Sequence, residues 1–74
     1  MSTDEKLIYM ANQIAGFFAA QGEARAVAGV GDHLIKFWEP PMRRRLLELA
    51  KQPDAGLNEF VCKALPLVRA SLAG

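Results

Sequence analysis

Apolar residues recur at three- and four-residue intervals in four stretches of the chain, and this spacing predicts four amphipathic α-helices. The stretches cover about residues 3–21, 23–38, 41–52 and 57–72. No stretch alternates apolar and polar residues in the manner of a half-buried β-strand, and the sequence contains no repeat. We therefore expect an all-α fold, a small bundle of about four short helices, in one domain that covers residues 1–74.

The first predicted helix begins with a capping box. Ser2 is followed three residues later by Glu5, so each side chain can accept a hydrogen bond from the other's backbone N–H at a helix start near Thr3. Gly22 predicts a break, because glycine readily takes the positive φ that ends a helix. The apolar positions cover about half of the helix circumference, more than the ~100° stripe of an ordinary surface helix. They are Leu7, Ala11, Ile14 and Phe18 along the centre, flanked by Met10, Phe17, Ile8 and Ala15.

The second predicted helix contains two glycines, Gly29 and Gly31. Each glycine lowers helix stability by up to ~1 kcal/mol relative to alanine. Two alternatives explain them. Either the glycines permit a close helix crossing, or the helix is frayed there and begins near Asp32, whose side chain would then cap it. The apolar side of this helix has Val27, Leu34 and Trp38 at its centre, and it is widened by Val30, Ile35 and Phe37.

Glu39-Pro40-Pro41 marks the boundary between the second and third helices. Proline lacks an N–H and disfavours helical geometry in the residue before it, so the second helix should stop here. Pro41 fits the first turn of the next helix. The two helices are therefore expected to meet at a Pro-Pro elbow of fixed geometry.

The third and fourth helices each carry one feature on the outer side. Arg44 should pair with Glu48, four residues later, and Pro66 should bend the last helix around the core. The residues expected to point inward are Met42, Leu46, Leu49 and Ala50 in the third helix and Leu57, Val61, Ala64, Leu65, Val68 and Leu72 in the fourth, with Phe60 and Leu67 at its edge.

Composition adds two expectations to this picture. Hydrophobic residues make up 51% of the 74 residues, more apolar material than so small a surface easily hides, so some of it is expected to face another chain. The net charge of +1 gives no field that would favour nucleic acid or an anionic membrane as a partner. No apolar run reaches the roughly 18 residues of a membrane span, and the acidic first residues lack the pattern of a signal peptide. With a single cysteine, these features predict a soluble, cytoplasmic protein.

The sequence offers no residues for a reaction, a cofactor or a metal. His33 has no Cys, Asp or second His at the spacing of a shared metal site, and Cys62 has no neighbouring His that would activate it as a nucleophile. Gly29-Val30-Gly31 lacks the preceding strand and the lysine of a phosphate-binding loop. We therefore expect no catalytic, cofactor-binding or metal-binding residues in this chain.

The three arginines at 43–45 break a local rule, because cations in the first turn of a helix oppose its dipole by about 0.3–1 kcal/mol each. Either Glu39 and Glu48 offset them, or a carboxylate on another protein does. Trp38 likewise has two interpretations, an anchor at an interface or simple core packing. If a partner binds at the elbow, the predicted contact residues are His33, Phe37, Trp38, Pro40, Met42 and Arg43.

Two segments of the chain resemble a known family. Met10-Ala11-Asn12-Gln13-Ile14-Ala15 with Phe17-Phe18, and Asp32-His33-Leu34 with Phe37-Trp38 and Pro40-Pro41-Met42-Arg43, are similar to the delta subunit of the soluble, NAD-dependent, molybdenum- or tungsten-containing formate dehydrogenases. The similarity covers nearly the whole chain in length and order. Its most specific part is the run Phe-Trp, acidic residue, Pro, any residue, Met-Arg. The second proline and the triple arginine are not required by the family pattern.

The resemblance implies a small accessory subunit that is non-catalytic and bound to the catalytic (alpha) subunit of a formate dehydrogenase complex. In such a complex the other subunits hold bis-molybdopterin guanine dinucleotide with Mo or W, iron–sulfur clusters, FMN and NAD, so no cofactor is expected here. The single cysteine agrees with this, since a cluster normally takes four thiolates.

Two other functions are open at this stage. The elbow could be the helix-turn-helix of a small DNA-binding or regulatory protein, although the near-zero net charge and the rigid Pro-Pro turn argue against it. The chain could also be a free-standing homodimer of helices.

Overall fold

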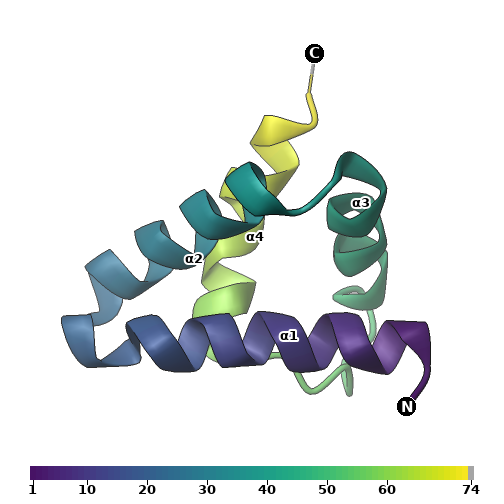
Figure 1. Cartoon of the computed structure of the whole chain (residues 1–74), viewed down its shortest axis with the longest axis horizontal. Helices are drawn as coiled ribbons and strands as arrows, with labels where there is room; N and C mark the ends of the chain where they lie inside the picture. Colours follow the sequence, from purple (N-terminus) through teal and green to yellow (C-terminus); the bar gives the residue numbers. More distant parts are fainter. Residues whose placement is uncertain (74) are drawn as a thin grey trace.

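Each stretch with a helical apolar repeat forms a helix in the structure, a computed structural model that describes residues 1–73. The helices are α1 (Thr3–Phe18), α2 (Glu23–Phe37), α3 (Pro40–Leu49) and α4 (Glu59–Ser71), with a 3₁₀ turn, η1 (Ala19–Gln21), between the first two (Figure 1). The described residues contain no strand. The prediction of an all-α fold with about four helices is confirmed.

The predicted capping box begins α1. The Ser2 hydroxyl accepts a hydrogen bond from the Glu5 backbone N–H at 3.1 Å, and the Glu5 carboxylate accepts one from the Ser2 N–H at 3.0 Å. The second bond lowers the pKa of Glu5, because the backbone N–H of Ser2 stabilises the charged carboxylate. At the other end, Gly22 has φ +90°, as the sequence predicts, and turns the chain from η1 into α2.

The elbow between α2 and α3 forms as predicted. Trp38 and Glu39 are both extended, with ψ 130° and 150°, and Pro40 and Pro41 occupy the first two positions of α3. Proline has no backbone N–H, and at these positions no hydrogen bond is lost, because the first N–H groups of a helix have no intrahelical acceptor. The elbow thus sets the direction of α3 relative to α2.

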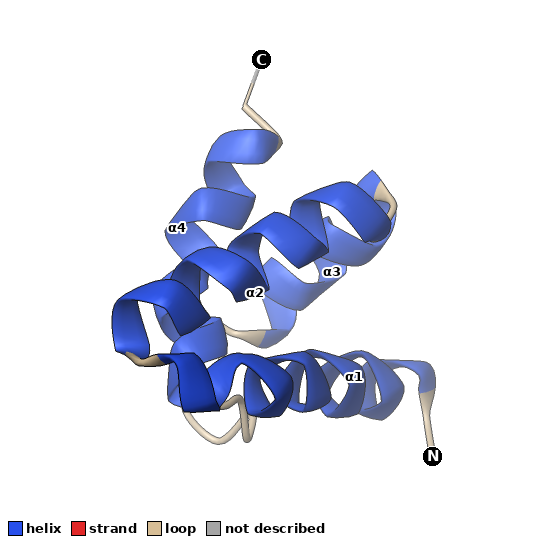
Figure 2. Cartoon of the chain, turned by 60° about the vertical axis from the view of Figure 1, so that its left-hand side comes forward, coloured by secondary structure: helices blue, strands red, loops and turns tan. Residues whose placement is uncertain are grey.

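The helices α1, α2 and α3 outline a triangle in Figure 1. The helices α1 and α2 meet at Gly22 and diverge from there, and α3 stands between their far ends. The helix α4 lies behind the triangle and packs mainly against α2. In this view no helix lies in front of the triangle. Figure 2, turned by 60°, shows α4 along one side of α2 with α1 running below both. One side of the triangle is therefore covered by a helix, and the other is open.

The core contains a few large aliphatic side chains and many small residues. The largest fully buried side chains are those of Leu34, Leu46, Val30, Val61 and Val68. Small residues lie at the contacts between helices and let the helix backbones pack closely. Little interior volume is left for aromatic rings. These small residues are Ala11, Ala15, Ala26, Gly31 and Ala64.

The two glycines of α2 permit close packing, and the alternative of a helix that begins near Asp32 is wrong. The helix runs without a break from Glu23. A Cβ atom on Gly29 would lie 2.6 Å from Cδ1 of the Phe18 ring, and one on Gly31 would lie 2.7 Å from Cδ1 of Leu67. The missing side chains thus give α1 and α4 room to approach α2.

The long loop between α3 and α4 is held by one side chain of α1. The amide of Asn12 donates to the carbonyl of Gly56 at 2.9 Å and accepts from the backbone N–H of Asn58 at 2.7 Å. Asn58 in turn caps α4 by accepting from the N–H of Phe60 at 2.8 Å. The cap explains why α4 begins at Glu59 and not at the predicted Leu57.

An ion pair joins the start of α1 to α3. The guanidinium of Arg45 donates to both carboxylate oxygens of Asp4, at 2.9 and 2.7 Å. This charge-assisted bond lowers the pKa of Asp4. The predicted pair of Arg44 with Glu48 is not observed. Glu48 instead accepts from Lys51 at 3.2 Å, and an arginine four residues before a glutamate is the weaker orientation of such a pair.

The same substitution at two glycines should have opposite effects. Gly16→Ala places a methyl group in open space within α1 and should raise the free energy of unfolding by about 0.5–1 kcal/mol through helix propensity. Gly29→Ala forces the Phe18 ring to move and should lower that free energy by about 1 kcal/mol or more. Urea unfolding followed by circular dichroism measures both. A stabilised Gly29→Ala variant would show that the contact with Phe18 does not restrict α2.

The Asp4–Arg45 pair should be visible in the titration of Asp4. Because the folded pKa of Asp4 lies below its ordinary value of 3.8, the pair contributes stability above that value and loses it as the pH falls through the folded pKa. In Arg45→Gln the pKa of Asp4 should return toward 3.8, since the bond to Arg45 is the largest cause of the shift. NMR titration of the Asp4 carboxyl carbon measures this. An unchanged pKa in Arg45→Gln would contradict the pairing.

Candidate interaction surface

Several large apolar side chains lie outside the core on the uncovered side of the triangle. Phe17 and Phe37 are 76% and 71% exposed, and Met10 is 40% exposed. Phe17 follows Met10 by seven residues and Ile14 by three, so these three side chains share one side of α1. On α2, His33 and Phe37 are four residues apart, and their rings lie 4.7 Å from each other. We call these five residues, Met10, Ile14, Phe17, His33 and Phe37, the open face.

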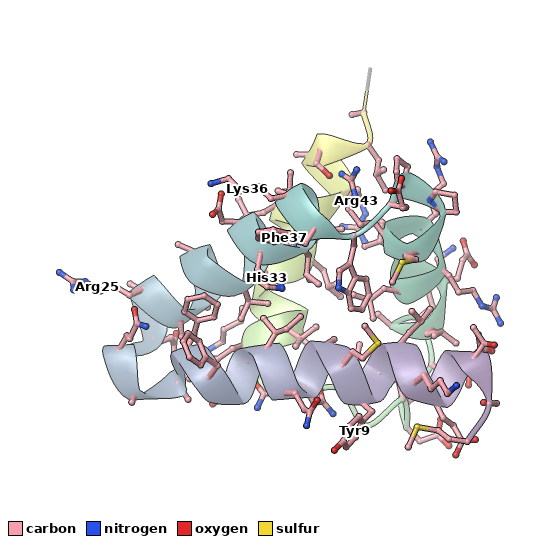
Figure 3. The ribbon with its side chains drawn as sticks, in the orientation of Figure 1. Tyr9, Arg25, His33, Lys36, Phe37 and Arg43 are labelled. Atoms are coloured by element: carbon pink, nitrogen blue, oxygen red, sulfur yellow. The ribbon has the colours of Figure 1, made fainter. Side chains whose placement is uncertain are left out.

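A pocket connects the two helices within the open face. It has a volume of about 230 Å³ and is lined by Ile14, Phe17, Phe18 and His33. The Phe17 ring meets the Phe18 ring edge-on at a centroid distance of 5.2 Å, which holds one wall in place. In Figure 3 His33 and Phe37 lie on the visible side of α2, whereas Tyr9 points away from α2 at the lower edge of α1. The pocket is therefore apolar except for the imidazole.

Charge around the open face is uneven. The helix α1 has no charged residue from Leu7 to its end, and η1 has none either. The outer edge of α2 carries Arg25 and Lys36 (Figure 3), and Lys36 pairs with Asp32 at 3.1 Å. No ion pair of Arg25 is found within residues 1–73, so this edge has a net positive charge.

The predicted contact residues fall into two groups. His33 is half-buried and Phe37 is exposed, and both belong to the open face. Trp38 is only 5% exposed and is part of the core, which favours the packing interpretation of this residue. Pro40 and Met42 are half-buried, and Met42 packs against the core. The structure therefore places His33 beside α1 residues in the pocket, with the Phe37 ring next to it, whereas Trp38 and Met42 belong to or pack against the core.

Arg43 is the sixth predicted contact residue, and its guanidinium is directed into the chain. It is 9% exposed, its Nε donates to the carbonyl of Trp38 at 3.0 Å, and its Nη1 donates to the hydroxyl of Ser71 at 2.6 Å. The Ser71 hydroxyl donates to the carbonyl of Val68 at 2.5 Å. The cation thus lies at the carboxyl ends of both α2 and α4, where the helix dipoles are negative. Within the described residues the hydrogen bonds of Arg43 go to these two ends and not to Glu39.

The remaining elbow arginines are also explained by position. Arg45 pairs with Asp4, as described above, and Arg44 is exposed on the outer side of α3. A helix-turn-helix that binds DNA needs its cations free to reach phosphates. With Arg43 and Arg45 engaged inside the chain, the elbow does not provide such a set.

Met10, Ile14 and Phe17 are not among the contact residues predicted from the sequence. The signal was present in the width of the apolar arcs, since an arc of half the circumference exceeds what a two-helix contact covers. The core takes the Leu7, Ala11 and Ala15 side of α1. Ile14 packs against it, and Met10 and Phe17 are left exposed at the edge of the arc. Only the packing of α1 against α2 shows which edge is left over.

Three further observations concern other kinds of site. Within residues 1–73 no group of three or more His, Cys, Asp or Glu side chains is placed to hold a metal ion. Over the same residues, no helix has the length and apolar character needed to cross a membrane. Cys62 is a free, exposed thiol on α4.

The hydrogen bonds of Arg43 should contribute to stability. Arg43→Ala leaves the Trp38 carbonyl and the ends of α2 and α4 without their cation, and should lower the free energy of unfolding by about 2–3 kcal/mol. Arg44→Ala, next to it but exposed, should change it by less than about 0.5 kcal/mol. Urea unfolding of both isolated variants tests this. Equal effects of the two substitutions would refute the assignment.

Comparison with known proteins gives one family. A family model described as "NADH-dependant formate dehydrogenase delta subunit FdsD" matches residues 6–65 of the 74-residue chain. The matched segment includes the open face, the elbow and the first half of α4. No curated protein and no solved structure matches the chain.

Proposed function

The chain belongs to the family of delta subunits of NADH-dependent formate dehydrogenases, and from this premise we propose that it is a non-catalytic accessory subunit that binds the catalytic subunit of such a complex and supports its assembly or stability. The observation that carries the proposal is the open face. Apart from Met1, the two most exposed large apolar side chains of this small subunit lie on one side. Such an apolar side is typical of a surface that becomes buried against a partner.

The proposal includes the cofactors that the resemblance implies for such a complex. Bis-molybdopterin guanine dinucleotide with Mo or W, iron–sulfur clusters, FMN and NAD are assigned to the other subunits. Cys62 offers one thiolate where a cluster normally takes four, and it lies at the surface. A free, exposed thiol also fits a reducing cytoplasmic location.

The location that we propose for the partner contact differs from the sequence-based prediction. We place the contact at His33 and Phe37 together with Phe17, and we assign Trp38 and Arg43 a supporting role inside the subunit. The two roles are separable by experiment, since substitutions at exposed residues change binding without removing core contacts.

Loss of the exposed rings should weaken the complex. Phe17→Ser and Phe37→Ser should each reduce the affinity for the purified catalytic subunit by about 1–2 kcal/mol, which is roughly five- to thirtyfold in Kd. Tyr9→Ser is the matched control, because Tyr9 is an exposed aromatic residue on the other side of α1. Isothermal titration calorimetry measures binding, and thermal unfolding of each variant shows whether the fold persists.

The control decides the outcome. If Tyr9→Ser weakens the complex as much as Phe37→Ser does, the open face is not the contact. If none of the three variants changes the affinity while the proteins remain folded, the apolar side chains of α1 and α2 play no part in binding.

A further inference from the structure

We propose that the open face receives an amphipathic α-helix of the partner subunit, which inserts one bulky apolar side chain into the pocket between α1 and α2 and presents acidic residues to the outer edge of α2. This inference rests on the proposed function and specifies the partner's segment. It follows from the position of the pocket between α1 and α2, the size of that pocket, the exposed aromatic area beside it and the charge at the edge of α2.

The position of the pocket suits a helix. The helices α1 and α2 diverge from Gly22, and α4 covers only the far side of the triangle they enclose with α3 (Figures 1 and 2). The pocket is lined by residues of both diverging helices, so a third helix laid over it would bury one apolar stripe against α1 and α2 together, as in helix-in-groove complexes. The backbone groups of a helix are already paired, so it brings no unsatisfied polar groups to an apolar surface.

The pocket accepts one large side chain. Its volume is about 230 Å³, and its lining of Ile14, Phe17, Phe18 and His33 offers polar atoms only from the imidazole. An apolar cavity of about 150 Å³ holds a benzene ring, so there is room here for one aromatic or branched aliphatic side chain. The exposed rings of Phe17 and Phe37 would then cover the flanks of the inserted residue.

The area of the face argues against a second copy of this chain as the occupant. Aromatic side chains bury about 150–250 Å² each, so Phe17 and Phe37 at 76% and 71% exposure offer on the order of 300 Å² between them. A stable interface buries about 800 Å² on each partner. The two rings thus offer enough area for the contact of one helix within a larger interface, and less than half of what a stable dimer built on them would bury.

Charge selects the polar side of the incoming helix. The edge formed by α1 has no charged residue from Leu7 to Gln21, so charge selection occurs on the α2 edge. There Arg25 has no ion pair within the described part of the chain, and the Lys36–Asp32 pair is neutral overall. Carboxylates next to the apolar stripe of the incoming helix would complement Arg25, and lysines there would be repelled.

Site-specific cross-linking in the assembled complex tests the inference. Phe17, Phe37 and, as control, Tyr9 are replaced one at a time by the photoreactive analogue benzoylphenylalanine, and the cross-linked peptide is sequenced by mass spectrometry. Positions 17 and 37 should cross-link to the same segment of the catalytic subunit, with apolar residues three and four apart and Asp or Glu beside them, and position 9 should not. Cross-links to another copy of this chain, or to a segment without that pattern, would overturn the inference.

A charge variant supplies the second readout. Arg25→Glu should slow association with the catalytic subunit several-fold at low salt, and the difference should vanish as salt is raised. Arg44→Glu makes the same change of charge on α3 and should leave the rate near that of the unaltered chain. Equal effects of the two variants would refute the role of the α2 edge.

The outcomes separate this inference from the proposed function. If the chain binds the catalytic subunit but positions 17 and 37 cross-link to no segment of the predicted kind, the inference fails and the proposed function stands. If an acidic helix of a different subunit of the complex is captured at both positions, the choice of the catalytic subunit is wrong and the helix inference stands. If no subunit of the complex associates with the chain, both fail.

Discussion

The arrangement of the helices depends on one buried cation. Arg43 lies in the first turn of α3. It donates hydrogen bonds to the carbonyl of Trp38, just after α2, and to the hydroxyl of Ser71 at the end of α4. Three helices therefore meet at one guanidinium, which fits the negative ends of two of them. The helix α4, which covers one side of the triangle, packs mainly on α2, and the Arg43 guanidinium ties the ends of these two helices to α3.

The composition of the interior explains where the aromatic residues lie. The helices approach closely because alanine and glycine occupy many of the contact positions, such as Ala11, Ala26 and Gly31. A close approach leaves room in the core for Trp38 but not for every phenylalanine, and Phe17 and Phe37 are on the outside. The 51% hydrophobic content of the chain is therefore divided between a dense core and an exposed apolar surface.

The sequence could predict what depends on neighbours along the chain. The capping box of Ser2 and Glu5, the turn at Gly22 and the start of α3 at the prolines all follow from local backbone chemistry. It could not predict contacts between distant residues, since nothing local shows that Arg43 reaches Ser71, 28 residues away.

Because contacts between distant residues could not be predicted, the predicted contact residues include both exposed and buried side chains. His33 and Phe37 lie on the open face, but the place of Trp38 in the core depends on how α3 packs. The two interpretations of the α2 glycines also could not be separated from the sequence, because only the position of the Phe18 ring distinguishes close packing from fraying.

The link between Asn12 and the loop before α4 has a consequence for the order of events during synthesis. The bonds of Asn12 are to residues 44 and 46 positions later in the chain. At a ribosomal rate of 5–20 residues per second, α1 emerges roughly 2–9 s before the backbone that fixes it. Until then α1 can pack on α2 but lacks the two bonds that hold it in its final place. A partner that recognises α1 and α2 together would therefore find this surface in its final form only after the loop before α4 has been synthesised.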